Sequence, residues 1–209
     1  MRAGLEKKNR KEMVYDAILE GIFAGEYAPN QILNEQALTE KFGCSKSPVR
    51  EALITLCSEG VLKNLPRYGY EVVRLTEEDV RGILSFRLVL EGGFLRLGDF
   101  SPARLEELRR LDASCQKATD DLWRHWEANT QFHLALIACS GNQYAWQQLK
   151  SAMGILKRAY AQFYWGKWNS FSPAMDVRCH CGILDALEKG DRDEAVRLLG
   201  LDLEDFRIS

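Results

Sequence analysis

The first third of the chain opens with apolar residues at helical spacing. Val14, Ile18 and Ile22 recur at four-residue intervals and Gly25 interrupts the run, so we expect a helix over residues 9–24. This helix would bury a single apolar stripe against the elements that follow it.

The next fifty residues predict a short helix, a longer helix and a hairpin. Leu38 faces inward on the short helix, and Gly43 breaks that helix. Ser45 is a good N-cap for the longer helix, and residues 61–73 predict two short strands around a tight turn. This order of elements is typical of a winged helix-turn-helix.

The N-terminal end of the longer helix is where such a domain would meet DNA. Hydroxyl and cationic side chains there suit phosphate clamping and guanine recognition, and the wing tip adds a further cation and a glycine. The predicted DNA-binding residues are Gln36, Ser45, Lys46, Ser47, Arg50, Arg67 and Gly69. Spacing alone leaves an alternative open, a small helical domain whose basic helix end is merely solvated.

Strand signals end at Thr76, where three acidic residues follow a good helix cap. Helical spacing then predicts six helices, near residues 76–98, 102–117, 120–140, 142–166, 173–189 and 191–206. Their short connections favour an antiparallel bundle. We therefore expect a mainly α protein, with a winged helix-turn-helix at residues 1–74 and an all-α helical bundle at residues 75–209.

Composition and charge add little to this interpretation. The chain has 209 residues, of which 46% are apolar and 28% charged, and its net charge is -2. No run approaches the roughly 18 apolar residues of a membrane span, and no signal peptide is evident, so we expect a cytoplasmic protein. Because residues 1–74 carry only 11 Lys and Arg against 10 Asp and Glu, DNA binding must rest on where the cations lie.

The six cysteines are expected to be reduced thiols in a chain of this kind. Cys179-His180-Cys181 lacks the second Cys/His pair of a zinc finger, which disfavours a zinc knuckle. A nucleophile-base motif, a phosphate loop and a cofactor fingerprint are all missing from the sequence, so an enzyme is the least favoured class.

Four polar side chains interrupt the apolar faces of three predicted helices. Asn129 and His133 share a stripe one turn apart, His180 lies among apolar residues of the fifth helix, and Asp202 does so on the sixth. A buried polar group without a partner costs about 1–3 kcal/mol, so these groups should meet one another or a ligand. Two imidazoles, a carboxylate and an amide oxygen could bind Zn, Ni, Mn or Fe. A buried hydrogen-bond network is the alternative.

Arg87 and Glu91 also fall on an apolar stripe, four residues apart. This spacing allows them to pair across one helical turn. The alternative is that Arg87 reaches into a pocket and binds the carboxylate of an effector.

The first third closely resembles the GntR family of regulators. The resemblance lies in residues 38–53 (LTEKFGCSKSPVREAL), 56–62 (LCSEGVL) and 66–69 (PRYG). It implies that Lys46, Arg50 and Gly69 meet DNA. Arginine is usual at the position of Lys46, and lysine cannot make the planar bidentate contact, so base readout there should be looser.

The remaining two thirds resemble the FCD effector domain of the FadR subfamily, in its six-helix VanR-like branch. The resemblance lies in residues 87–91 (RLVLE), 132–142 (FHLALIACSGN) and 180–195. Metal-binding members hold an ion with an aspartate and three histidines, which correspond here to Asn129, His133, His180 and Asp202. Two of these positions depart from the family pattern, because Asn129 replaces the aspartate and Asp202 replaces the last histidine.

Together these patterns predict a regulator that binds a palindromic operator as a homodimer, and the family resemblance implies that it is a repressor. A small organic acid in the C-terminal domain, held directly or through a divalent metal, would change its DNA affinity. A helical domain that only dimerises is the main alternative, and a metal-dependent enzyme is the least favoured.

Overall fold

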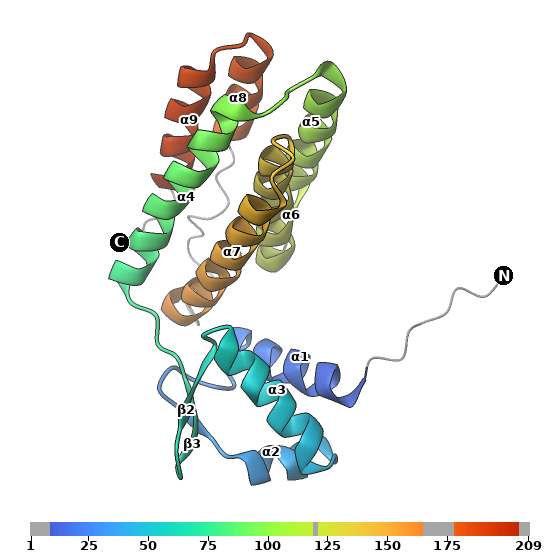
Figure 1. Ribbon diagram of the computed structural model, residues 1–209, viewed down its shortest axis with the longest axis vertical. Coiled ribbons are helices and arrows are strands. Elements are labelled where there is room, and N and C mark those ends of the chain that lie inside the picture. The colour runs from blue at the N-terminus through green and yellow to red at the C-terminus, as the bar shows by residue number, and fades with distance from the viewer. Residues whose placement is uncertain (1–8, 119–120, 165–177, 205–209) are drawn as a thin grey trace, which may run out of the picture. The chain divides into compact units, whose positions relative to one another are not determined.

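The computed structural model describes residues 9–118, 121–164 and 178–204 (Figure 1). The chain divides into two units, of which the first comprises residues 1–75 with 158–165 and the second comprises the remainder. Among the described residues, no helix combines the length and the apolar character that a membrane span requires.

Three helices and a small sheet form the first unit. The helices are α1 (Arg10–Phe23), α2 (Glu35–Phe42) and α3 (Lys46–Ser58), and the strands are β1 (Ile32–Leu33), β2 (Leu62–Leu65) and β3 (Gly69–Val72). The sheet is antiparallel in the order β1-β3-β2, with Asn64 opposite Tyr70 in the hairpin. The winged helix-turn-helix prediction is therefore confirmed for these elements.

The sequence prediction missed β1, which pairs Ile32 and Leu33 with Glu71 and Tyr70. Two residues are too few to show the alternation that identifies a strand. Leu33 is buried while Ile32 is exposed, so this strand completes the sheet and closes one edge of the core.

Local caps explain where the helices of the first unit begin and end. Asn9 and Glu12 form a capping box at the start of α1, and Gly43 ends α2 in the left-handed region at φ 58°. Ser45 is the N-cap of α3, as predicted, but its hydroxyl makes no capping hydrogen bond. The end of α7 also belongs to this unit, where Arg158 Nη1 donates to the Gly60 carbonyl at 2.8 Å.

Six described helices form the second unit, as the sequence predicted. They are α4 (Glu77–Leu97), α5 (Pro102–Lys117), α6 (Leu122–Ala138), α7 (Gln143–Tyr164), α8 (Arg178–Glu188) and α9 (Arg192–Glu204). Of the predicted helical positions, 120, 165–166, 173–177 and 205–206 lie outside the described residues.

Apolar side chains of α4, α5, α6, α8 and α9 form one core in the second unit. Within it, α8 packs on α9 and on α5, while α6 packs on α4 and on α5. Thr76 and Asp79 form a capping box at the start of α4, which begins where the acidic residues predicted it. These packed faces place polar residues from five helices inside one core.

Candidate DNA interface and candidate metal centre

A groove in the first unit lies between the start of α2, the start of α3 and the β2–β3 hairpin. It has a volume of about 360 Å³, and its lining includes Gln36, Lys46, Arg67 and Gly69. The fold thus brings together four of the seven residues predicted to bind DNA. Ser45, Ser47 and Arg50 stand on the first turns of α3 without lining this groove.

Arg50 is exposed and forms a two-pronged ion pair with Glu35. Its Nε and Nη2 atoms donate to the carboxylate at 3.0 and 2.8 Å. These hydrogen bonds raise the pKa of Arg50 above its usual value. The pair joins α2 to α3 and holds the guanidinium in a defined orientation at the protein surface.

Two other predicted DNA-binding side chains pair along their own helices. Gln36 Nε2 donates to Glu40 at 2.9 Å, and Ser47 Oγ donates to Glu51 at 2.8 Å. Both pairs are exposed, so they cost little to exchange for contacts with a ligand.

The wing tip has an unusual backbone at Arg67 and Gly69. Arg67 adopts φ 72°, a left-handed conformation that few non-glycine residues take. Gly69 adopts φ 130°, and a Cβ there would lie 2.5 Å from the Leu33 carbonyl oxygen. Close packing of β3 on β1 is therefore sufficient to require this glycine, whatever it does toward DNA.

The second unit holds the four polar residues that were predicted to share a site. Asn129, His133, His180 and Asp202 are each at most 2% exposed. One ligand atom from each of His133, His180 and Asp202 lies within 4.8 Å of the other two. The structure therefore joins α6, α8 and α9 at a single polar cluster, and Asn129 lies one turn before His133 on α6.

Asp202 lies between the two histidines. Its Oδ2 is 3.3 Å from His133 Nε2, and its Oδ1 is 3.5 Å from His180 Nε2. The opposite ring nitrogens face other carboxylates: His133 Nδ1 is 2.7 Å from Glu91 Oε2, and His180 Nδ1 is 3.3 Å from Asp112 Oδ1.

Arg87 pairs with Glu91, as their four-residue spacing predicted. Arg87 Nε donates to Glu91 Oε1 at 2.7 Å, and both side chains are buried. A role for Arg87 toward an effector carboxylate stays a prediction. Glu91 thus accepts from an arginine with one oxygen and faces a histidine with the other.

Opposite charges shift the pKa values of this cluster in opposite directions. Burial by itself raises the pKa of Glu91, but Arg87 and His133 outweigh it and lower that pKa. Burial lowers the pKa of His133, but the Glu91 carboxylate outweighs it and raises that pKa. Burial raises the pKa of Asp202, whereas the two histidines lower it below its usual value. Electrostatic pairing thus outweighs desolvation at all three groups.

The donor set fits a divalent cation. Asn129 Oδ1, His133 Nε2, His180 Nε2 and Asp202 Oδ2 are all buried and make no hydrogen bond within the described part of the chain. Each can offer a lone pair, and buried acceptors without hydrogen-bond partners are uncommon in folded proteins. These are the four positions that the family resemblance implied, with the two departures included.

Sequence analysis did not connect Glu91 to His133 and missed Asp112 entirely. Asp112 shares the buried stripe of α5 with Leu105, Leu108 and Cys115. A carboxylate on an apolar helical stripe is the signal that singled out Asp202, and it could have identified Asp112 as well.

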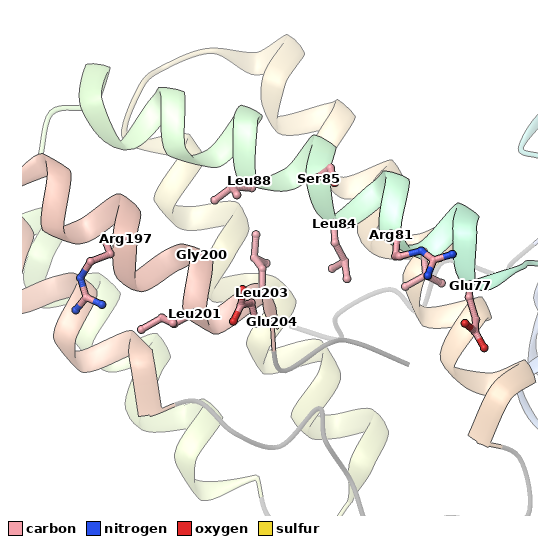
Figure 2. A pocket seen from close by; sticks show the side chains of 11 residues that line it. Glu77, Arg81, Leu84, Ser85, Leu88, Arg197, Gly200, Leu201, Leu203 and Glu204 are labelled. Atoms are coloured by element: carbon pink, nitrogen blue, oxygen red, sulfur yellow. The ribbon is translucent and has the colours of Figure 1, made fainter. Parts of the chain in front are cut away.

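A larger cavity lies between α4 and α9 in the second unit (Figure 2). Its volume is about 550 Å³, and its lining combines Leu84, Leu88 and Leu201 with Arg81 and Arg197. None of the predicted metal or effector residues is among the described residues that line it. The polar cluster and this cavity are therefore separate features of the second unit.

The three side chains of the Cys179-His180-Cys181 segment differ in burial. His180 is buried within the cluster, Cys179 is half-buried and Cys181 is exposed.

Together, a winged helix with cations along its groove and a helical second unit define the architecture of a two-domain DNA-binding regulator. Residues 10–72 match the bacterial regulatory proteins of the gntR family, and residues 82–205 match the FCD domain. The chain belongs to the GntR family of transcriptional regulators and carries an FCD domain. Members of this family are transcriptional regulators, so the chain is not an enzyme.

Relatives and a solved structure agree with this assignment. An uncharacterized HTH-type transcriptional regulator in an unstable DNA locus of Streptomyces ambofaciens is 31% identical over 187 residues, covering 88% of this chain and 78% of the relative. The HTH-type transcriptional repressor RspR of Escherichia coli is 26% identical over 193 residues, covering 87% and 80%. A GntR transcriptional regulator structure from Rhodococcus sp. RHA1 shares the fold, with a TM-score of 0.70, 24% identity and 95% coverage of both chains.

Proposed function

We propose that this regulator represses its target genes by binding a palindromic operator as a homodimer. Residues 1–74 bind the DNA, and residues 75–209 dimerise and bind a small organic acid through a divalent metal. The name of RspR, a transcriptional repressor, supports repression as the mode of action. Because its partner is DNA, we place the protein in the cytoplasm.

The observation that carries the ligand-binding half of this proposal is the set of four buried acceptor atoms. Asn129, His133, His180 and Asp202 each bring one acceptor that makes no hydrogen bond within the described residues. Such a set is costly in a core unless a cation or a hydrogen-bond donor joins it. A metal held by these residues would supply a positive centre for the oxygen atoms of an acid.

The donor types narrow the metals to be tested. Two imidazoles favour Zn, Ni or Fe, while the carboxylate and the amide oxygen add the harder character that suits Mn. An acid with a second oxygen donor next to its carboxylate is the effector class that such a centre would favour.

The DNA-binding half rests on the exposed polar residues of the first unit. Lys46 and Arg50 would enter the major groove on α3, and the wing would bring Arg67 to the adjacent backbone or minor groove. Gln36, Ser45, Ser47 and Gly69 complete the proposed interface.

The exposed side of α4 supports the homodimer. Phe86, Val89 and Leu97 are large apolar residues that are more than 40% exposed. They fall within about 80° of one another around the helix, given a rotation of about 100° per residue. A contiguous exposed apolar stripe of this kind is a typical protein contact surface.

Selection of operator sequences from random DNA by the purified full chain tests the proposal. We expect an inverted repeat, bound by a dimer, whose affinity changes when metal and a metal-chelating hydroxy or keto acid are added together. An acid shifts DNA affinity only by its different affinities for the two states of the protein. A dimer that binds the operator but responds to no metal and no acid would leave the second unit as a dimerisation domain alone.

A further inference from the structure

We propose that Glu91 and Asp112 are positioning residues that aim the two histidines of the cluster at Asp202. This inference rests on the metal centre of the proposed function and extends it beyond the four residues that would hold the ion. Both carboxylates are buried, and each faces the Nδ1 atom of one imidazole.

Glu91 holds His133 from α4. The 2.7 Å contact between Glu91 Oε2 and His133 Nδ1 is a hydrogen bond, and Arg87 Nε occupies the other oxygen at 2.7 Å. All three side chains are at most 1% exposed, so water does not compete for these contacts. Arg87 therefore acts as the anchor that keeps the Glu91 carboxylate in place.

Asp112 holds His180 from α5 by a looser contact of 3.3 Å. Its other oxygen, Oδ2, accepts from Gln116 Nε2 at 2.9 Å. The ring of Phe132 stacks on the ring of His180, with centroids 3.8 Å apart and planes inclined by 16°. The aromatic ring limits rotation of the imidazole, and Asp112 selects which nitrogen faces away from Asp202.

The hydrogen bond from His133 Nδ1 to Glu91 fixes the tautomer of His133, whereas the 3.3 Å contact of His180 Nδ1 with Asp112 is an ion-pair contact without a hydrogen bond and favours the same tautomer electrostatically. An imidazole that gives its Nδ1–H to a carboxylate keeps a lone pair on Nε2, where a metal can bind. In this chain both Nε2 atoms then face the same Asp202 carboxylate, at 3.3 and 3.5 Å. With the proton of each ring on Nδ1, the two Nε2 atoms and the Asp202 carboxylate are three acceptors facing one another, an arrangement that a cation stabilises.

The carboxylates of Glu91 and Asp112 should differ in how strongly they support metal binding. Glu91 makes the shorter contact and is charge-paired with Arg87, whereas Asp112 makes a longer contact and is held by a neutral amide. We therefore expect the loss of Glu91 to weaken metal binding more than the loss of Asp112.

The test replaces each carboxylate by its amide and measures metal affinity in the full chain. Zinc affinity is measured by competition with a chromophoric chelator, and the visible absorption of cobalt(II) reports the geometry of the ligands. Glu91→Gln should raise the zinc Kd about 10- to 100-fold, and Asp112→Asn by about tenfold, at unchanged stoichiometry. Both variants should also alter the cobalt spectrum.

Matched controls are available on α8. Asp185 and Glu188 form an exposed pair of contacts with Arg109, at 2.9 and 2.7 Å. Asp185→Asn and Glu188→Gln make the same chemical changes in the same unit, and should leave both the zinc Kd and the cobalt spectrum unchanged.

The possible outcomes separate this inference from the proposed function. Wild-type zinc affinity and spectrum in both Glu91→Gln and Asp112→Asn would overturn the positioning role and leave the metal centre intact. A wild-type chain that binds neither zinc nor cobalt would overturn the metal centre and the positioning role together. Asp112→Asn leaves no buried arginine without its carboxylate, so it decides the role of Asp112 even if Glu91→Gln does not fold.

Discussion

The two polar regions of this protein, the DNA-binding surface and the buried cluster, obey different energetics. At the surface, Arg50 is exposed, and its ion pair with Glu35 could be exchanged for a phosphate or a base at small cost. In the second unit, His133 and Asp202 are almost completely buried, and either would cost several kcal/mol if it lost its partners.

This difference decides how far each site can be inferred from its contacts. The surface contacts of Arg50, Gln36 and Ser47 are the weak local pairs that any exposed helix forms. The buried cluster, in contrast, has four acceptors without hydrogen-bond partners among the described residues, and this deficit is the basis of the proposed metal site. The DNA-binding surface is therefore inferred from the positions of its residues and from the family. The buried site is inferred from polar atoms that lack hydrogen-bond partners.

The largest expected effect is the loss of bound metal from the cluster. Protein purified without chelator should contain close to one metal ion per protomer, and His133→Ala should contain none, as measured by elemental mass spectrometry. His125→Ala is the matched control, because His125 is equally buried but its ring faces the Cys115 carbonyl at 3.2 Å. Wild-type protein that stays metal-free after reloading with Zn, Ni or Mn would contradict the metal centre.

The rate of thiol alkylation should also differ between buried and exposed cysteines. Burial, together with the nearby Asp112 and Asp202 carboxylates, raises the pKa of Cys115 to about 12. At pH 8 its thiolate fraction is then about a thousandfold below that of an ordinary thiol with a pKa of about 8.5. Because Cys181 is exposed, iodoacetamide should label it far faster than Cys115, as peptide mass spectrometry would measure. Equal labelling of the two would show that the core of the second unit opens readily.

A smaller effect is expected at the surface. Arg50→Ala should weaken operator binding about 10- to 100-fold and relax the preference at one base pair, since it removes a bidentate donor from α3. Fluorescence anisotropy on the selected operator measures this change. Arg110→Ala is the control, because Arg110 is also an exposed arginine in an ion pair, with Glu106 on α5. If both variants bind alike, Arg50 has no specific part in recognition.

The smallest expected effect is a gain in DNA sequence specificity. Lys46→Arg should improve discrimination between the operator and a single-mismatch operator by less than about tenfold, because arginine can form the planar two-pronged contact that lysine cannot. Competition between the two DNAs in the same anisotropy assay measures the ratio. Unchanged discrimination would place Lys46 on the phosphate backbone rather than on a base.

Sequence reasoning succeeded where the signal was local. The helix starts at Thr76 and Ser45 and the end at Gly43 follow from residues within one turn. The apolar stripes likewise showed that His133 and Asp202 face a core. The sequence prediction failed where a structure depends on a distant partner. Strand β1, for example, forms only because Leu33 pairs with Tyr70.

The candidate sites show the same division. Gly69 was expected to allow DNA to approach, yet the Leu33 carbonyl oxygen alone excludes a side chain there. Glu91 was expected to pair with Arg87, yet its contact with His133, 42 residues away, has no signal in the sequence. Asp112 carried a readable signal, but nothing local indicates that its partner is His180.

The sequence by itself determined the helices, their buried faces and the family. Helical periodicity and capping depend on residues within one turn of about 3.6 residues, so neighbouring residues are enough to specify them. Only the tertiary structure decided that α6, α8 and α9 bring His133, His180 and Asp202 to one point, with Glu91 and Asp112 behind the two rings. The physical reason is that the rotation and the height of each helix depend on how all the core side chains pack together, which no single segment specifies.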